Sequence, residues 1–248
     1  MGWQVRHKPD EAPASITVSS DGADNPGHLL PTTRLEAFSD GVFAIAITLL
    51  VLELHVPTAQ ASLVKGLEHE WSRYLGYFVS FAFIGGVWIA HSSMTRFMKA
   101  ADLALMRLNL MLLLFVSFLP FTTAIVATHL FASSFIFTHH ASSGASLVAE
   151  RVAVVIFGLN LTLADLMVYL AIRHAGRSPD LAADDMAEGE LQAFAGERRT
   201  ALLLQAAAAV VGAFLPAIAV VFYLAVSVLY VVEPLWHIRI RIPRAAPR

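Results

Sequence analysis

The 248-residue chain contains no cysteine, and only 15% of its residues are charged. The absence of cysteine excludes disulfide bridges, thiolate metal ligands and cysteine nucleophiles, and it leaves the redox compartment open. The net charge of −2 provides no excess of basic residues, so no nucleic-acid partner is expected. The sequence also lacks a phosphate-binding loop, a dinucleotide fingerprint, and the GxSxG and HExxH motifs, so it indicates neither nucleotide binding nor common hydrolase chemistry.

Hydrophobic residues, by contrast, make up 57% of the chain. They form runs that can cross a bilayer, which takes about 20 mainly apolar residues. The pattern predicts an all-α membrane protein with six transmembrane helices. A run from 200 to 232 is divided at Pro216, because Gly212 and Pro216 favour a helix break. The expected spans are 34–54, 73–94, 103–128, 149–173, 198–214 and 215–232.

Three regions follow from this pattern. Residues 1–31 are polar and lack the apolar core of a signal peptide, so we expect a disordered cytoplasmic tail. Residues 32–236 form the transmembrane domain, and residues 237–248 form a basic cytoplasmic C-terminal tail.

Charge placement predicts the orientation of the helices. Of the 17 lysines and arginines, all but Lys65, Arg73 and Arg151 lie on one side of the six-span arrangement, together with both termini. By the positive-inside rule that side is the cytoplasm. We therefore expect a multi-pass protein of the cell membrane, surrounded by the lipid bilayer.

The N-terminal end of the first expected helix is charged. Ser39 and Asp40 lie near membrane depth, where inserting a carboxylate costs roughly 2.5–3.5 kcal/mol. Such a charge indicates a function or a fixed partner. We expect Asp40 to face the helix bundle, with Ser39 relaying its hydrogen bonds. The candidate partners are Arg34, His91 and Asn109.

The same helix has one continuous apolar stripe when its residues are placed about 100° apart. The stripe consists of Gly41, Ile45, Thr48, Leu49 and Leu52. Around a shared axis, its large residues would form hydrophobic rings that gate ions by dewetting, and Thr48 would form a ring of hydroxyls. Glu53 would concentrate cations at the outer mouth. Ordinary helix packing is the alternative interpretation of the stripe.

Three motifs occur in order along the first half of the chain. RxxxFSD begins the first helix, WxxH ends the second, and LN is followed by LPF in the third. Together they resemble the transmembrane protein 175 family of lysosomal and bacterial potassium channels, over about residues 34–127. The signature residues are Arg34, Phe38, Ser39, Asp40, Trp88, His91 and Asn109.

The resemblance implies a potassium-selective channel with passive, leak-type conduction and modest selectivity. It implies one six-helix repeat per subunit, a homotetramer, and a central pore lined by the first helix. Its constrictions would be Ile45, Leu49 and Leu52, and its selectivity residue Thr48. The permeant ion would be K⁺, with no cofactor. The signature residues would form a structural network between the first three helices, with Trp88 in a packing role.

Other functions remain open for the buried polar groups. A proton-coupled secondary transporter or a proton-permeable channel would use Asp40 and His91, although a structural role is favoured for His91. A membrane enzyme would need a nucleophile beside this pair, and no nucleophile motif is present.

Two further groups of residues call for an interpretation. For Asp165, an intramembrane charge in the fourth span, we expect a local salt bridge with Arg173 or Arg198. The expected loop after the third span carries His129, His139 and His140, which lack a second pair at ligand spacing. We therefore expect no metal site there.

Overall fold

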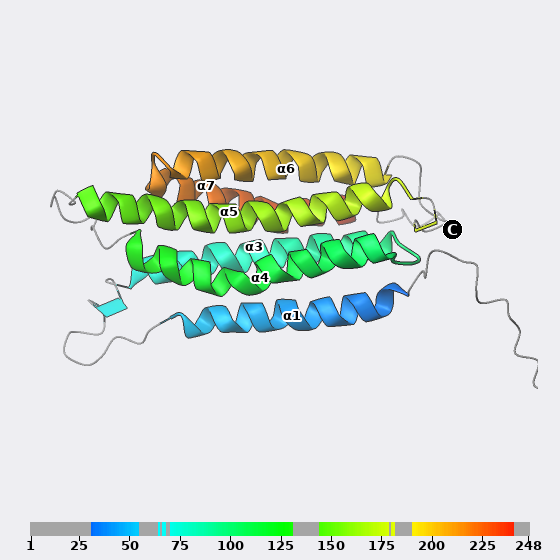
Figure 1. Ribbon diagram of the computed structural model, residues 1–248, viewed down its shortest axis with the longest axis horizontal. Helices are drawn as coiled ribbons and strands as arrows, with labels where there is room; N and C mark the ends of the chain where they lie inside the picture. Colours follow the sequence, from blue (N-terminus) through cyan, green and yellow to red (C-terminus); the bar gives the residue numbers. More distant parts are fainter. Residues whose placement is uncertain are drawn as a thin grey trace, which may run out of the picture.

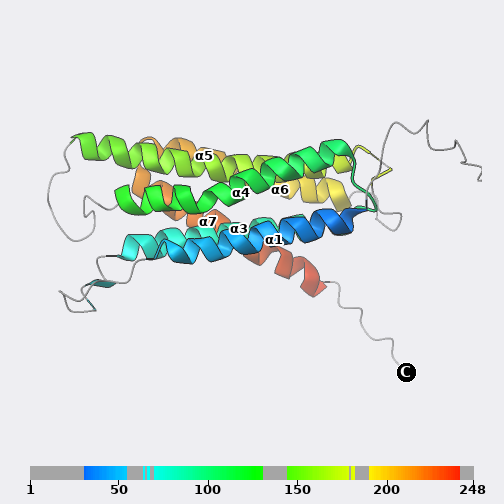
Figure 2. The same cartoon turned by 60° about the horizontal axis from the view of Figure 1, so that its bottom comes forward.

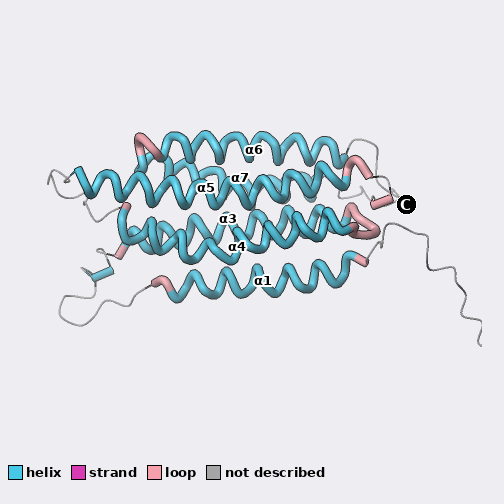
Figure 3. The backbone as a smooth tube through the Cα atoms, in the orientation of Figure 1, coloured by secondary structure: helices cyan, strands magenta, loops and turns pink. Residues whose placement is uncertain are grey.

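The structure, a computed structural model, describes residues 31–54, 64, 66–67, 70–130, 144–178, 180–181 and 190–240. Long helices running side by side, joined by turns and loops, make up this part of the chain (Figures 1 and 3). In chain order they are α1 (Thr32–Leu52), α3 (Trp71–Arg96), α4 (Leu103–His129), α5 (Gly144–Ala175), α6 (Glu190–Gly212) and α7 (Pro216–Ile240). The expected tails lie largely outside the described residues.

The predicted all-α fold class is confirmed, because the described part of the chain forms six long helices where six spans were expected. Four of the described helices are long and apolar enough to cross a membrane. These spans are Thr32–Leu52, Trp71–Arg96, Leu103–His129 and Leu147–Ala175. A shorter apolar segment, Pro216–Val232, begins α7.

The ends of the last two helices differ from the prediction. Helix α6 begins at Glu190, well before the predicted start at 198, and α7 continues to Ile240, past the predicted domain limit at 236. Hydropathy marks only the apolar part of a helix, whereas backbone hydrogen bonding continues into polar surroundings. The predicted break is present, because α6 ends at Gly212 and α7 begins with Pro216, which needs no N–H donor at a first helical position.

The helices are packed so that α1 lies at one edge of the bundle. Helix α5 packs between α4 and α6, while α7 packs against α3 and α6 (Figures 1 and 2). Within the described residues, α1 contacts α3 and α4. Helices α3 and α7 approach closely at Gly86, where an added Cβ would lie 2.4 Å from the Tyr230 Cβ. A glycine is therefore needed at this crossing.

Helix α1 is attached to the bundle through one face. Its buried residues are Ser39, Phe43, Ala46 and Leu50, at the three- and four-residue spacing of one helix face. The opposite face is also apolar, and among the residues that the structure describes nothing covers it. An apolar surface of this kind meets lipid or another protein surface.

Candidate functional site

The predicted stripe of α1 lies on this uncovered face. The exposed fractions are 60% for Ile45, 40% for Leu49 and 72% for Leu52. Thr48 is also exposed, and its Oγ1 donates to the Ile45 carbonyl oxygen at 2.8 Å. Gly41 is open, since nothing lies within 4 Å of an added Cβ. Within the described residues, the stripe therefore does not pack against the other helices of its own subunit.

Asp40 lies on an open flank of α1 and bonds to Trp88. The indole Nε1 of Trp88 on α3 donates to Asp40 Oδ1 at 2.8 Å, and both side chains are exposed. The expectations that Asp40 faces the bundle, and that Arg34, His91 or Asn109 pairs with it, are therefore wrong. Because α1 lies at the edge, the flank carrying Asp40 remains open. Within a membrane, an indole N–H needs a hydrogen-bond acceptor from the protein. The presence of Trp88 in the second span is therefore the sequence signal for a donor to Asp40.

A separate buried network joins three helices. His91 Nε2 on α3 lies 2.9 Å from Asn109 Oδ1 on α4, and because an amide oxygen only accepts, Nε2 carries the proton. Asn109 Nδ2 donates to Ser39 Oγ on α1 at 3.0 Å, and Ser39 Oγ donates to the Leu35 carbonyl at 2.8 Å. His91, Asn109 and Ser39 are almost completely buried. The expected tie between the first three spans is therefore present in this chain of hydrogen bonds.

Four signature residues lie outside that network, and two of them, Asp40 and Trp88, bond to each other. Arg34 and Phe38 are exposed at the head of α1, and Phe38 is 59% exposed. The structural network is thus smaller than the signature.

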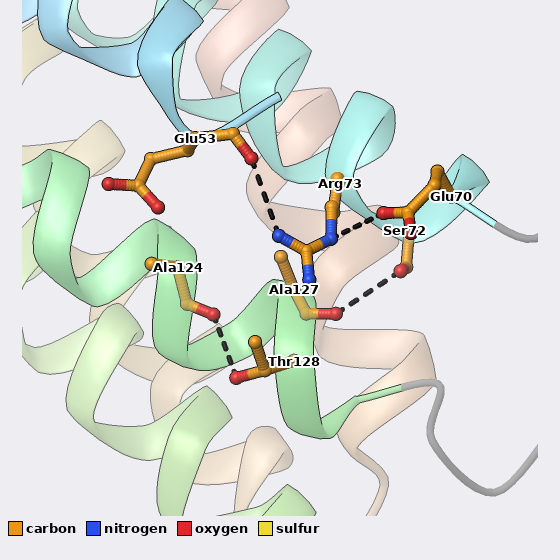
Figure 4. Close-up of polar contacts among 7 residues, drawn as sticks. All are labelled: Glu53, Glu70, Ser72, Arg73, Ala124, Ala127 and Thr128. Carbon is orange, nitrogen blue, oxygen red and sulfur yellow. Dashed lines mark hydrogen bonds and ion pairs between the residues drawn. The ribbon is translucent and has the colours of Figure 1, made fainter. Parts of the chain in front are cut away.

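The far end of α1 is held by Arg73, which was not among the expected site residues. Arg73 Nη1 donates to the Glu53 carbonyl oxygen at 3.5 Å, and its Nε lies 2.5 Å from Glu70 Oε2 (Figure 4). Ser72 Oγ donates to the Ala127 carbonyl at 3.2 Å and ties α3 to α4. The Glu53 carboxylate points away from Arg73 (Figure 4). The i,i+3 spacing of Glu70 and Arg73 is the sequence signal for this pair.

Asp165 on α5 is bonded to Tyr230 on α7, whose hydroxyl donates to Asp165 Oδ2. The guanidinium of Arg198 on α6 lies over the Tyr230 ring, 4.8 Å from its centroid. Arg173 Nη1 instead donates to the Tyr169 hydroxyl at 3.0 Å. The predicted salt bridge of Asp165 with Arg173 or Arg198 is therefore wrong, because the tyrosine from α7 meets both the carboxylate and the Arg198 guanidinium.

The expected histidine cluster is described only in part. His129 ends α4, where its Nδ1 lies 2.9 Å from both Thr128 Oγ1 and the Ile125 carbonyl. His139 and His140 lie outside the described residues. In the part of the chain that the structure describes, no three His, Asp or Glu side chains are arranged to hold a metal ion.

Several apolar helices of membrane-spanning length, held together by buried polar contacts, define a multi-pass helical membrane protein. Its residues 34–120 match the family described as "Endosomal/lysosomal potassium channel TMEM175". Through this segment, the chain is similar to the TMEM175 family.

Individual relatives are consistent with that similarity. A protein named potassium channel from Streptomyces collinus is 46% identical over 99 residues, which are 39% of this chain and 48% of the relative. The human "Endosomal/lysosomal proton channel TMEM175" is 42% identical over 101 residues, which are 37% of this chain and 20% of the relative. The chain spans about half the length of the bacterial relatives it matches.

The structural likeness extends further than the sequence match. The crystal structure of a lysosomal potassium-selective channel TMEM175 homologue from Chamaesiphon minutus has a TM-score of 0.67 and 28% sequence identity. The likeness covers 82% of this chain and 97% of that one. It therefore includes helices beyond residue 120, where the family match ends.

Proposed function

We propose that this chain is a subunit of a potassium-selective cation channel that conducts passively along an axis lined by α1. The observation that carries the proposal is the position of α1, which packs on α3 and α4 through one face and leaves the Ile45–Leu52 stripe uncovered. The names of the bacterial relatives support K⁺ as the permeant ion. Selectivity is modest, because the sequence has no TVGYG loop whose carbonyls would replace the hydration shell.

The proposed assembly is a homotetramer in which four α1 helices enclose the axis. Ile45, Leu49 and Leu52 then form hydrophobic constrictions, and Thr48 supplies hydroxyl oxygens between them. Glu53, at the end of α1, places carboxylates near the mouth and raises the local cation concentration. Association also covers apolar surface that a single copy leaves open.

We further propose that the basic end of the bundle faces the cytoplasm of the cell that carries this protein in its plasma membrane. Arginines and lysines gather where α3 ends, α4 begins, α5 ends and α6 begins. The positive-inside rule assigns that end to the cytoplasm.

The proposal is tested by K⁺ flux from liposomes that contain the purified full chain. Ile45→Asn is expected to increase the leak, because a polar side chain wets the constriction. Thr48→Ala is expected to reduce the preference for K⁺ over Na⁺. Val210→Asn is the control for Ile45→Asn, since Val210 is 65% exposed on α6, away from the stripe, and it should leave flux unchanged. Saturable, obligatory exchange without single-channel steps would contradict a channel.

A proton-permeable channel is the second candidate, favoured by the name of the human relative. Asp40 and His91 belong to separate hydrogen-bonded groups, so a direct proton transfer between them has no support in the geometry. Proton flux in the same liposomes distinguishes the candidates. Proton current without K⁺ current, lost in Asp40→Asn, would favour this candidate over a potassium channel.

A further inference from the structure

An open cavity of about 350 Å³ lies between α4 and α5 at the basic end of the bundle. We call it the boundary pocket. Its lining residues are Leu108, Leu170, Arg173, His174 and Arg177. The α5 membrane span ends at Ala175 and the α4 span begins at Leu103, so the pocket lies at the level where both helices leave the membrane.

The two arginines of the boundary pocket are available to an anion. Both are exposed, and in the described part of the chain neither guanidinium contacts a carboxylate. Arg173 is held in place by the Tyr169 hydroxyl, to which its Nη1 donates at 3.0 Å. Arg177 follows one turn later, so the two guanidinium groups can meet one phosphate, for which their fork geometry is suited.

The nearby carboxylate has a different partner. Asp102, the N-cap of α4, accepts from the Leu105 N–H at 2.8 Å and lies 2.7 Å from His174 Nε2. Because Asp102 is paired with His174 and with the helix N-terminus, it does not neutralise Arg173 or Arg177. The rim of the pocket therefore keeps a net positive charge. Leu108 and Leu170 add an apolar wall, which a soluble phosphate would not use.

We propose that the boundary pocket binds the phosphate headgroup of an anionic phospholipid, with an acyl chain against Leu108 and Leu170. Basic pockets between membrane helices at this level bind anionic headgroups, and each arginine near an anionic surface contributes about 1 kcal/mol, a factor of roughly 5 in affinity. The bound lipid bridges α4 and α5 and stabilises their packing. This inference requires a membrane protein but does not depend on the pore or on its permeant ion.

The test is thermal unfolding of the purified full chain in detergent. Phosphatidylglycerol, phosphatidylcholine and inorganic phosphate are each titrated into wild type, Arg173→Gln/Arg177→Gln and Arg199→Gln. Arg199 is the control, since it is an exposed arginine at the same end outside the pocket. Phosphatidylglycerol should raise the midpoint of wild type and of Arg199→Gln. The double variant should bind it roughly 25-fold more weakly. Its midpoint without lipid should equal that of wild type, because both arginines are exposed.

Three outcomes would overturn the proposal. Phosphatidylglycerol could raise the unfolding midpoint of the double variant as much as that of wild type, or phosphatidylcholine could raise the wild-type midpoint as much as phosphatidylglycerol does. Inorganic phosphate could also reproduce the shift, which would indicate a free-anion site. A second measurement needs no variant. Native mass spectrometry of wild type taken from bicelles with equal amounts of both lipids should show retained phosphatidylglycerol. Equal retention of both lipids would contradict the inference.

Discussion

The indole N–H of Trp88 on α3 donates to the Asp40 carboxylate on α1, with 2.8 Å between Nε1 and Oδ1. This hydrogen bond ties the head of the proposed pore-lining helix to its neighbour from outside the buried core. It joins α1 and α3, whereas the buried network of Ser39, Asn109 and His91 joins these two helices and α4, and the two groups share no bond. The head of α1 is thus held by two independent polar contacts.

Trp88→Phe removes the donor and keeps an aromatic ring. Because both partners are exposed, we expect at most about 1 kcal/mol of lost stability, together with an altered K⁺ flux as α1 loses one attachment. Asp40→Ala should have the same effect, and the double variant should be no worse than either single one. Thermal unfolding and liposome flux measure both. Fully additive effects would contradict a direct interaction.

Ser39→Ala breaks the buried network and leaves Asn109 Nδ2 without its acceptor. We expect a loss of about 1–2 kcal/mol in the free energy of unfolding, measured by denaturation in mixed micelles. The matched control is Ser117→Ala, whose hydroxyl is exposed and donates to Leu114 of its own helix. Its effect should stay within about 0.5 kcal/mol. Equal effects at both positions would argue against a tie between helices.

Gly86→Ala places a methyl group against Tyr230, where an added Cβ would lie 2.4 Å from the Tyr230 Cβ. We expect a loss of about 1–3 kcal/mol from forced separation of α3 and α7. Gly85→Ala is the control, since nothing lies within 4 Å of its added Cβ. It should be neutral or stabilise the helix by up to about 1 kcal/mol. Comparison of their melting temperatures tests the close approach.

Tyr230→Phe removes the hydroxyl that donates to Asp165 and leaves the buried carboxyl group without that partner. The expected loss is about 1–3 kcal/mol in the free energy of unfolding. Tyr74→Phe, at a partly buried position on α3, is the control and should change little. If the two substitutions have the same effect on the melting temperature, the Tyr230 hydroxyl does not stabilise Asp165.

Asp102 is expected to make the stability of the folded protein depend on pH. Partial burial raises the pKa of Asp102, but hydrogen bonds from the Leu105 N–H and from His174 outweigh it, so the pKa lies below its usual value of 3.8. A lowered carboxyl pKa stabilises the fold above the unfolded-state pKa, and this stabilisation is lost as the pH falls through the lower folded-state pKa.

Asp102→Asn should therefore lower the melting temperature at pH 7, and its difference from wild type should shrink below about pH 4. Asparagine still caps α4, so the change reports the lost charge. Asp180→Asn, at an exposed position, is the control variant. A constant difference for Asp102→Asn between pH 7 and pH 3 would contradict the assignment.

The sequence by itself determined the number of helices, their order and the polarity of α1. Runs of apolar residues long enough to cross a bilayer leave few alternatives to helices, because every backbone polar group must be satisfied within the segment. The stripe from Gly41 to Leu52 followed from helical periodicity alone, and the described part of the subunit leaves that face uncovered.

The tertiary structure decided which partners Asp40 and Asp165 have. Asp40 bonds to Trp88, and Asp165 bonds to Tyr230 from a helix 65 residues further along the chain. Periodicity gives the face of a helix on which a residue lies, but the partner depends on which helices pack together and at what level. That arrangement is set by close contacts such as Gly86 against Tyr230, which no single helix contains.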